Sequence, residues 1–363
     1  MLAPAVVPPP IETSSSTSAA RRAAALACVV VSVLLVPLGL RLVNAERKVA
    51  APPPTYLPAL EGPREREAFE ASRVSDLARL NPGFVVIGDS MAGTRIDEQR
   101  LGELSGRPVA PLLQPGSGSA FWYLALKNWV IASRIRPRVV FVFFRDTNLT
   151  DVMFRLDEQF RWSLDSVALD REDELNAVVA TRASTLARRL DLAIERVYQG
   201  DHARRWMEPA FVGWPARLLE PSRRHREEFL AAMNARFSLD QLRPTEVADV
   251  QTSDDGGADF ARYVDRSVLP RMLRDAKAAG LTLCLVRVQR RPDGGKPPAQ
   301  SPAMRRYIGD LRGYIESHGG LFHDDTGDPA LTIGMYENGD HIARQARVRY
   351  TDIFYDRLRP LFQ

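Results

Sequence analysis

The sequence predicts an α/β protein built on a mostly parallel β-sheet. From about residue 70 onward, short and continuously apolar segments recur along the chain, as in strands that are buried on both faces. Longer segments between them carry apolar residues at helical spacing. Because parallel strands are joined by helical crossovers, these two observations together favour the α/β class.

The predicted strands follow from the apolar runs. They are FVVIG at 84–88, PVAPLLQ at 108–114, RVVFVFF at 138–144 and LTLCLVRV at 281–288, with a short fifth strand near 320–323. The segment at 119–135 joins the second strand to the third and has the spacing of a crossover helix. The segment ARVRYTDIFYDRLRPLF closes the chain as a predicted amphipathic helix.

The third and fourth predicted strands are separated by far more residues than a crossover needs. We predict a mainly helical insertion over about 151–255 at the edge of the sheet, and a loop over 250–260 that returns the chain to the sheet. The insertion could form a lid, a partner surface or a wall that binds a polymer. Its tryptophans could stack on sugars or belong to a core; they are Trp162, Trp206 and Trp214.

An apolar run near the N-terminus is the clearest topological signal. The run AAALACVVVSVLLVPLGL carries no charge and is about long enough to cross a bilayer. It is an uncleaved anchor or a signal peptide cut after Ala45, and either interpretation places the following domain outside the cytoplasm. The predicted organisation is a disordered segment at 1–20, an anchor at 21–43, a Pro-rich linker at 44–69 and the α/β domain at 70–363.

Composition excludes several classes of function. The formal charge is +4 with nearly equal numbers of acids and bases, and no basic stripe with aromatic residues is present, so we expect no nucleic-acid partner. Two cysteines, Cys28 and Cys284, give neither a disulfide framework nor a metal cluster. No phosphate-binding loop, HExxH motif or zinc-ligand spacing occurs, so the sequence implies no cofactor and no metal.

Ser90 is the first candidate for chemistry. It lies in GDS, directly after the first predicted strand, and in a parallel sheet the carboxyl ends of the strands are where reactive groups gather. A nucleophilic serine needs a base, a group that orients the base, and donors for the oxyanion. The alternative is that GDS only caps the following helix, since Asp and Ser are both favoured caps.

Two further segments favour the catalytic interpretation. The segment QPGSGSAF places Gly116 and Gly118 after the second strand, where a backbone amide could face an oxyanion. Near the end of the chain, YENGDHIARQ puts His341 beside Asp340 in a Gly-containing loop. Of the 5 histidines, only His341 combines an adjacent acid, a loop setting and a place after the last predicted strand.

With these segments the sequence resembles the SGNH hydrolase family, also called GDSL esterases. The resemblance covers about 80–145 and 280–363 and implies a three-layer α/β/α sandwich with a flavodoxin-like, mostly parallel sheet. It implies Ser90 as the nucleophile, Gly118 as an oxyanion donor and His341 as the base.

The chain departs from the family pattern in two blocks. The third block of the family reads GxND, whereas this chain has FFRDTNLT, so Asn148 is displaced and Arg145 or Asp146 occupies the strand end. Arg145 and Asn148 are therefore both candidate oxyanion donors. In the last block Asn338 stands where the family has Asp. Asp340 is our predicted partner of His341, and Asn338 is its rival.

The anchor, the linker and the GDS serine together are similar to the membrane-anchored SGNH-like proteins that O-acetylate bacterial polysaccharides. That resemblance implies a polysaccharide substrate and a membrane-bound O-acyltransferase as partner. Our expectation is an O-acetyltransferase or acetylesterase outside the cytoplasm, periplasmic or extracellular. The alternatives are an esterase for small esters and a catalytically degenerate binding or assembly module.

Overall fold

The computed structural model describes part of the chain and divides it into two units. The described residues are 24–28, 31, 35, 39, 69–156, 158–169, 172–183, 186, 190, 258–292, 299–337 and 339–363. The units are Met1–Pro54 with Leu186–Leu219, and Thr55–Thr185 with Glu220–Gln363. All elements named below belong to the second unit.

Most of the predicted anchor and most of the predicted insertion lie outside the described residues. Within the first unit, residues 24–28 are helical. Among the residues that the structure describes, none belongs to a helix long and apolar enough to cross a bilayer.

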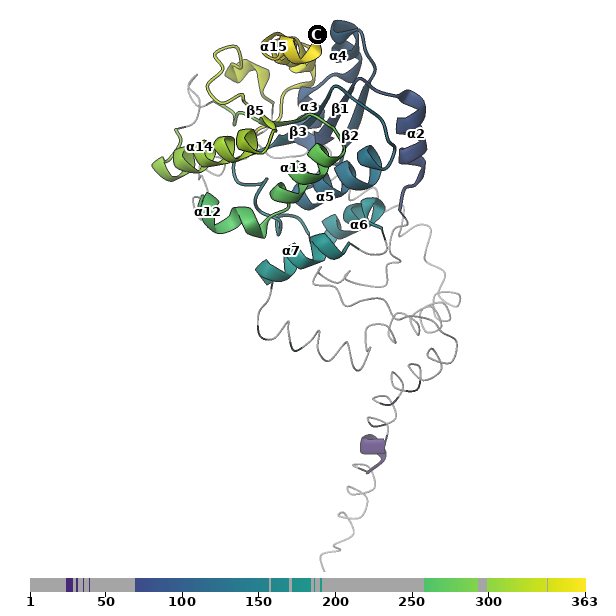
Figure 1. Ribbon diagram of the computed structural model, residues 1–363. Helices are drawn as coiled ribbons and strands as arrows, with labels where there is room; N and C mark the ends of the chain where they lie inside the picture. Colours follow the sequence, from purple (N-terminus) through teal and green to yellow (C-terminus); the bar gives the residue numbers. More distant parts are fainter. Residues whose placement is uncertain are drawn as a thin grey trace, which may run out of the picture. The chain divides into compact units, whose positions relative to one another are not determined.

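The centre of the second unit is a parallel sheet, as predicted (Figure 1). It has 5 strands in the order β2-β1-β3-β4-β5, and every neighbouring pair is parallel. The strands are β1 (Phe84–Gly88), β2 (Val109–Leu113), β3 (Val139–Phe144), β4 (Leu283–Arg287) and β5 (Leu321–Asp324). Each predicted apolar run therefore contains one strand.

The strand order makes the end of β1 the expected place for a ligand. After β1 the chain adds β2 on one side, then crosses to add β3 on the other side, so β1 lies at the point where the winding reverses. In open α/β sheets the carboxyl ends of strands at such a point form the ligand-binding crevice. In the register, Gly88 pairs with Leu113 of β2, which brings the loops that follow both strands to the same edge.

Helices cover both faces of the sheet, which confirms the expected three-layer sandwich. Val85 and Ile87 of β1 join one buried apolar cluster, while Phe84 and Val86 join another on the opposite face. The first cluster is covered by α2 (Ser72–Leu80), α5 (Ser119–Leu124), α13 (Leu269–Ala278) and α14 (Pro302–Ser317). The second is covered by α3 (Ser90–Arg95), α4 (Glu98–Ser105), α15 (Arg347–Arg357) and α16 (Arg359–Phe362). Each large apolar side chain buried in this way stabilises the fold by about 1.5–3 kcal/mol.

Two elements differ in detail from the predicted ones. The crossover helix at 119–135 is α5 followed by a π-helical segment, η1 (Ala125–Ile131). The first part of the predicted insertion forms α6 (Glu158–Val167) and α7 (Asp173–Ala183), whose apolar residues, Leu164 and Val178 among them, belong to the first core cluster. This part is therefore integral to the sandwich. The remaining short elements are α12 (Phe260–Tyr263), η4 (Val264–Arg266), η5 (Ile333–Met335) and η6 (Arg344–Ala346).

Candidate active site

Ser90 begins α3 directly after β1, but it does not cap the helix. The cap is Asp89, whose Oδ1 accepts a hydrogen bond of 2.9 Å from the backbone N–H of Met91. A capping carboxylate of this kind satisfies one of the free N–H groups in the first turn. Because Asp89 takes that role, the hydroxyl of Ser90 is left for another contact.

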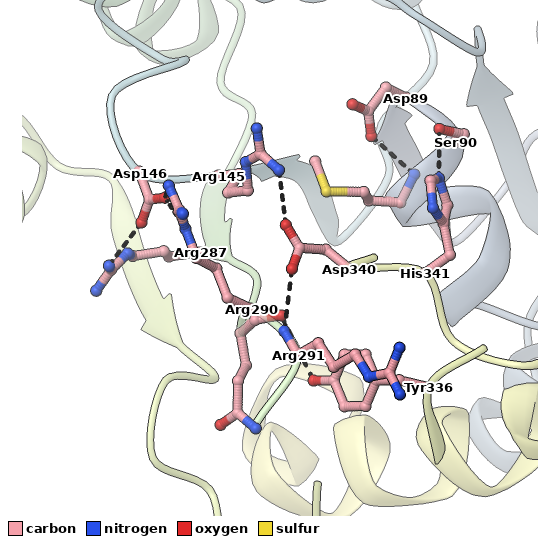
Figure 2. A network of polar contacts seen from close by, with 12 residues as sticks. Asp89, Ser90, Arg145, Asp146, Arg287, Arg290, Arg291, Tyr336, Asp340 and His341 are labelled. Atoms are coloured by element: carbon pink, nitrogen blue, oxygen red, sulfur yellow. Dashed lines mark hydrogen bonds and ion pairs between the residues drawn. The ribbon is translucent and has the colours of Figure 1, made fainter. Parts of the chain in front are cut away.

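That contact is with His341. Ser90 Oγ lies 2.9 Å from His341 Nε2 (Figure 2). The histidine is held by a narrow turn in which Tyr336 and Ile342 form an antiparallel bridge and the N–H of Glu337 donates to the His341 carbonyl at 3.1 Å. The N–H of Ile342 also donates to Thr94 Oγ1 of α3 at 3.4 Å. The turn thereby lies against the helix that carries Ser90.

Asp340 connects the His341 loop to the ends of two strands. Its Oδ2 accepts from Arg145 Nη1 at 2.6 Å, and its Oδ1 accepts from the backbone N–H of Arg291 at 3.0 Å (Figure 2). Arg145 follows β3, and Arg291 comes shortly after β4. Both carboxylate oxygens of Asp340 are thus used to anchor the loop. The rival residue Asn338 lies outside the described residues.

The loop after β2 is fastened to the end of β1. The carbonyl of Gly88 accepts from the N–H of Gln114 at 3.0 Å and from Ser117 Oγ at 3.3 Å. Gly118 follows as the N-cap of α5. A Cβ at Gly118 would lie 2.5 Å from the Phe154 carbonyl oxygen, so only glycine fits there without a shift of the backbone.

Two backbone N–H groups in the segments that follow β1 and β2 are candidates to bind an oxyanion. Within the described part of the chain, the hydrogen bonds include none in which the N–H of Ser90 or of Gly118 donates. Asn148 is buried in the turn after β3, where its N–H donates to the Arg145 carbonyl at 2.9 Å. The structure brings Ser90 and His341 together and places Arg145 on Asp340, whereas no described contact joins Asn148 to Ser90 or His341.

Buried charge surrounds the serine. Burial raises the pKa of the Asp89 carboxyl, and this outweighs the opposing effects of the Met91 N–H, Arg155 and His341. Burial alone would lower the pKa of the Arg145 guanidinium. The charge of Asp340 and its hydrogen bond to Arg145 outweigh burial, so that this pKa is raised. Arg145 therefore remains a cation in the site.

Sequence reasoning missed a second ion network behind the first. Asp146 has a left-handed backbone with φ of +45° and turns its carboxylate away from Asp340. Its Oδ1 accepts from Arg287 Nη2 at 2.8 Å and its Oδ2 from Arg290 Nε at 2.6 Å. Arg287 is buried at the end of β4. An arginine inside an otherwise apolar strand was the one sequence signal for this network.

The arrangement supports chemistry at a serine hydroxyl. An imidazole nitrogen at hydrogen-bond distance can accept the proton of that hydroxyl as it attacks a carbonyl carbon. The residues that the structure describes contain no group of His, Cys, Asp and Glu side chains that could hold a metal ion.

Comparisons with known proteins add one structural similarity. No protein-family model matches the chain, and no curated protein matches it. Among solved structures, a protein from Bacteroides fragilis proposed to be an acylhydrolase is similar, with 11% sequence identity and a TM-score of 0.38, over 82% of this chain and 100% of that one. A TM-score this low leaves the chemistry to be inferred from the residues themselves.

Proposed function

We propose that this protein is an SGNH-like acyl-serine enzyme that moves acetyl groups onto or off a cell-envelope polysaccharide or an exopolysaccharide. Ser90 is the nucleophile and His341 is the base. The observation that carries the proposal is the 2.9 Å separation of Ser90 Oγ and His341 Nε2 at the carboxyl edge of the sheet. In acyl transfer, a base at this distance activates the hydroxyl and later returns the proton.

The proposed reaction has two halves. Ser90 Oγ attacks the ester carbonyl carbon while its proton passes to His341 Nε2, and the carbonyl oxygen becomes an oxyanion. The N–H groups of Ser90 and Gly118 are the first candidate donors to that oxyanion, and Arg145 and Asn148 are further candidates. The ester C–O bond then breaks, the leaving alcohol takes the proton from His341, and acetyl-Ser90 remains.

The acceptor decides the product. Attack by water on acetyl-Ser90 releases acetate and makes the protein an acetylesterase. Attack by a sugar hydroxyl gives an acetylated saccharide and makes it an O-acetyltransferase. In both cases His341 takes the proton of the acceptor and returns it to Ser90 Oγ.

The N-terminal sequence supports the proposed location. The uncharged run within 21–43 and the Pro-rich linker at 44–69 support a membrane-anchored protein whose α/β domain works in the periplasm or outside the cell. A membrane-bound O-acyltransferase is the proposed acetyl donor. A C-terminal fusion to a phosphatase that is active only outside the cytoplasm tests this orientation, and an inactive fusion would contradict it.

Turnover of 4-nitrophenyl acetate by the full chain tests the chemistry. We expect Ser90→Ala and His341→Ala each to lower kcat by about 10⁴-fold or more. Ser317→Ala and His318→Ala are matched controls, because both residues are exposed at the end of α14. If none of these substitutions changed the rate, the protein would instead be the binding or assembly module.

A second assay separates transfer from hydrolysis. The active chain is incubated with an acetyl ester and with saccharide oligomers, and the products are analysed by mass spectrometry. Oligomers that gain acetyl groups only with intact Ser90 support the acetyltransferase. Acetate as the sole product supports the acetylesterase or the small-ester hydrolase.

A further inference from the structure

Arg155 brings a guanidinium near Asp89 but forms no tight ion pair with it. Its Nη1 lies 4.0 Å from Oδ2 of Asp89, the residue directly before Ser90, and this is too long for a hydrogen bond. The other carboxylate oxygen of Asp89 accepts from the Met91 N–H. Within the described part of the chain, Arg155 donates no hydrogen bond at all. Its N–H groups are therefore available to a ligand.

The guanidinium is nevertheless held in place. It lies over the ring of Phe154 at 4.7 Å and over that of Phe160 at 5.2 Å, both within the range of cation–π attraction. The backbone of Arg155 is left-handed, with φ of +59°. For a residue other than glycine this conformation is uncommon.

The loop after β2 is shaped to admit this arginine. A Cβ at Gly116 would lie 2.6 Å from the ring of Phe160 and 3.7 Å from Arg155 Nη1. The missing side chain at Gly116 lets the ring and the guanidinium approach the loop. Arg155 therefore lies between two parts of the site, the residue that precedes Ser90 and the loop that carries Gly118.

The position is unfavourable for a cation that has no ligand. The Arg155 side chain is 32% exposed. Its burial lowers the pKa of the guanidinium; the attraction of Asp89 opposes this effect without cancelling it, and repulsion from Arg145 adds to it. Arg145 is different, because its Nη1 already donates to Asp340 at 2.6 Å. An anionic oxygen placed against Arg155 would supply both the charge and the acceptors that its surroundings lack.

We propose that Arg155 binds a carboxylate or phosphate group that the substrate carries next to its ester. The substrate class is then an acetylated acidic saccharide, and Arg155 selects it over a neutral one. This inference builds on the proposed function, since it names the substrate of the same site.

Three acetyl esters that differ in one group test the proposal. They are the monoacetates of methyl glucoside, of methyl glucuronide and of methyl glucoside 6-phosphate. For the full chain we expect kcat/KM to favour one of the charged esters over the neutral one by about 10- to 100-fold, the range of a charge-assisted hydrogen bond. The two charged esters distinguish carboxylate from phosphate.

Arg155→Gln should bring that ratio close to one, and Arg134→Gln should leave it as in the wild type. Arg134 is a matched control because it is an exposed arginine with nearly the same backbone, φ of +58°. A wild-type ratio near one, or a ratio that Arg155→Gln leaves unchanged, would overturn the proposal. If Arg155→Gln lowered kcat/KM equally for the neutral and the charged esters, the proposal would also be overturned, because Arg155 would then act on the ester itself.

A binding measurement tests the anion site even if the protein turns over none of these esters. A lack of turnover would count against the proposed function but not against the anion site. Glucuronate and inorganic phosphate are titrated into the full chain by calorimetry, with thermal unfolding as a check on folding. Binding that Arg155→Gln abolishes and Arg134→Gln retains supports the anion site. Equal binding by the wild type and both folded variants, or binding by none of them, overturns it.

Discussion

Arg145 Nη1 lies 2.6 Å from Asp340 Oδ2, so the carboxyl end of β3 is joined directly to the loop that carries His341. The second oxygen of Asp340 accepts from the N–H of Arg291, which follows β4. One carboxylate thus fixes a loop near the end of the chain to the ends of two central strands. From this arrangement we expect Asp340 to position the proposed base through the backbone of its own loop.

Removal of this anchor should affect activity more than folding. Asp340→Ala leaves the His341 loop without both contacts, and small displacements of a catalytic group lower rates strongly, so we expect kcat to fall by about 10- to 100-fold. Because Arg145 is 33% exposed, water can solvate it, and we expect the free energy of unfolding to fall by only about 1–3 kcal/mol. Ester turnover and urea unfolding measure the two effects.

The matched control for that prediction is Asp352→Ala. Asp352 accepts from Arg100 at 2.7 Å in a pair whose side chains are 37% and 39% exposed. Water screens a pair that is this exposed, so we expect its loss to change neither the stability nor kcat appreciably. An Asp340→Ala protein with wild-type kcat would show that the anchor is not needed to position His341.

Asp146 should matter for stability. Asp146→Ala leaves the buried Arg287 without one of its acids, and breaking a buried ion pair costs about 3–5 kcal/mol. Burial opposes the charge of Asp146, but Arg290 and Arg287 lower its pKa below the ordinary 3.8. Its contribution is therefore present above about pH 4 and is lost as the pH falls through the native-state pKa. Urea unfolding at several pH values should show the difference between wild type and variant shrinking in acid, and a difference that grew in acid would contradict this assignment.

Asp89 should show the opposite dependence on pH. Burial raises the pKa of Asp89 above the ordinary 3.8, so the charged carboxylate weakens the fold. The contribution of Asp89 to the free energy of unfolding is therefore greatest below pH 3.8 and declines as the pH rises through the native-state pKa. Asp89→Asn keeps an oxygen that can cap the Met91 N–H and removes the charge. We expect the variant to be more stable than the wild type at pH 7 and equal to it at about pH 3. Lower stability at pH 7 would mean that Arg155, His341 and Arg145 outweigh burial.

Gly118 should tolerate no side chain. In Gly118→Ala the new methyl group would meet the Phe154 carbonyl oxygen at 2.5 Å, and we expect a loss of about 1–3 kcal/mol together with reduced activity. Gly309→Ala is the control, because Gly309 lies exposed within α14 with nothing within 4 Å of its Cβ position. There, alanine should stabilise the helix by about 0.5–1 kcal/mol. Thermal unfolding of both variants checks the contrast.

The sequence was most informative where the structure depends on local patterns. Buried parallel strands must be apolar on both faces, so FVVIG and VVFVFF could be recognised as β1 and β3 directly. Ser90 could be placed at the sheet edge because it follows β1 at once. His341 could be chosen because it stands in a loop after the last strand, and the structure brings its ring to Ser90.

The sequence was least informative where the site depends on distant contacts. Nothing near Asp340 indicates that its carboxylate meets Arg145, which lies 195 positions away. Arg155 lacks a local signal too, because its place depends on a left-handed turn and on a neighbouring loop that lacks a side chain at Gly116. Such features follow from the packing of whole loops, which periodicity does not encode.

The proposed nucleophile and base lie 251 positions apart, and this has a consequence during synthesis of the chain. Ser90 leaves the ribosome long before His341, and the turn that holds His341 needs α3 on one side and the strand ends on the other. A growing chain would therefore carry a serine with no base. The proposed nucleophile would gain its reactivity only when the last segments have docked, so that esters met during synthesis are spared.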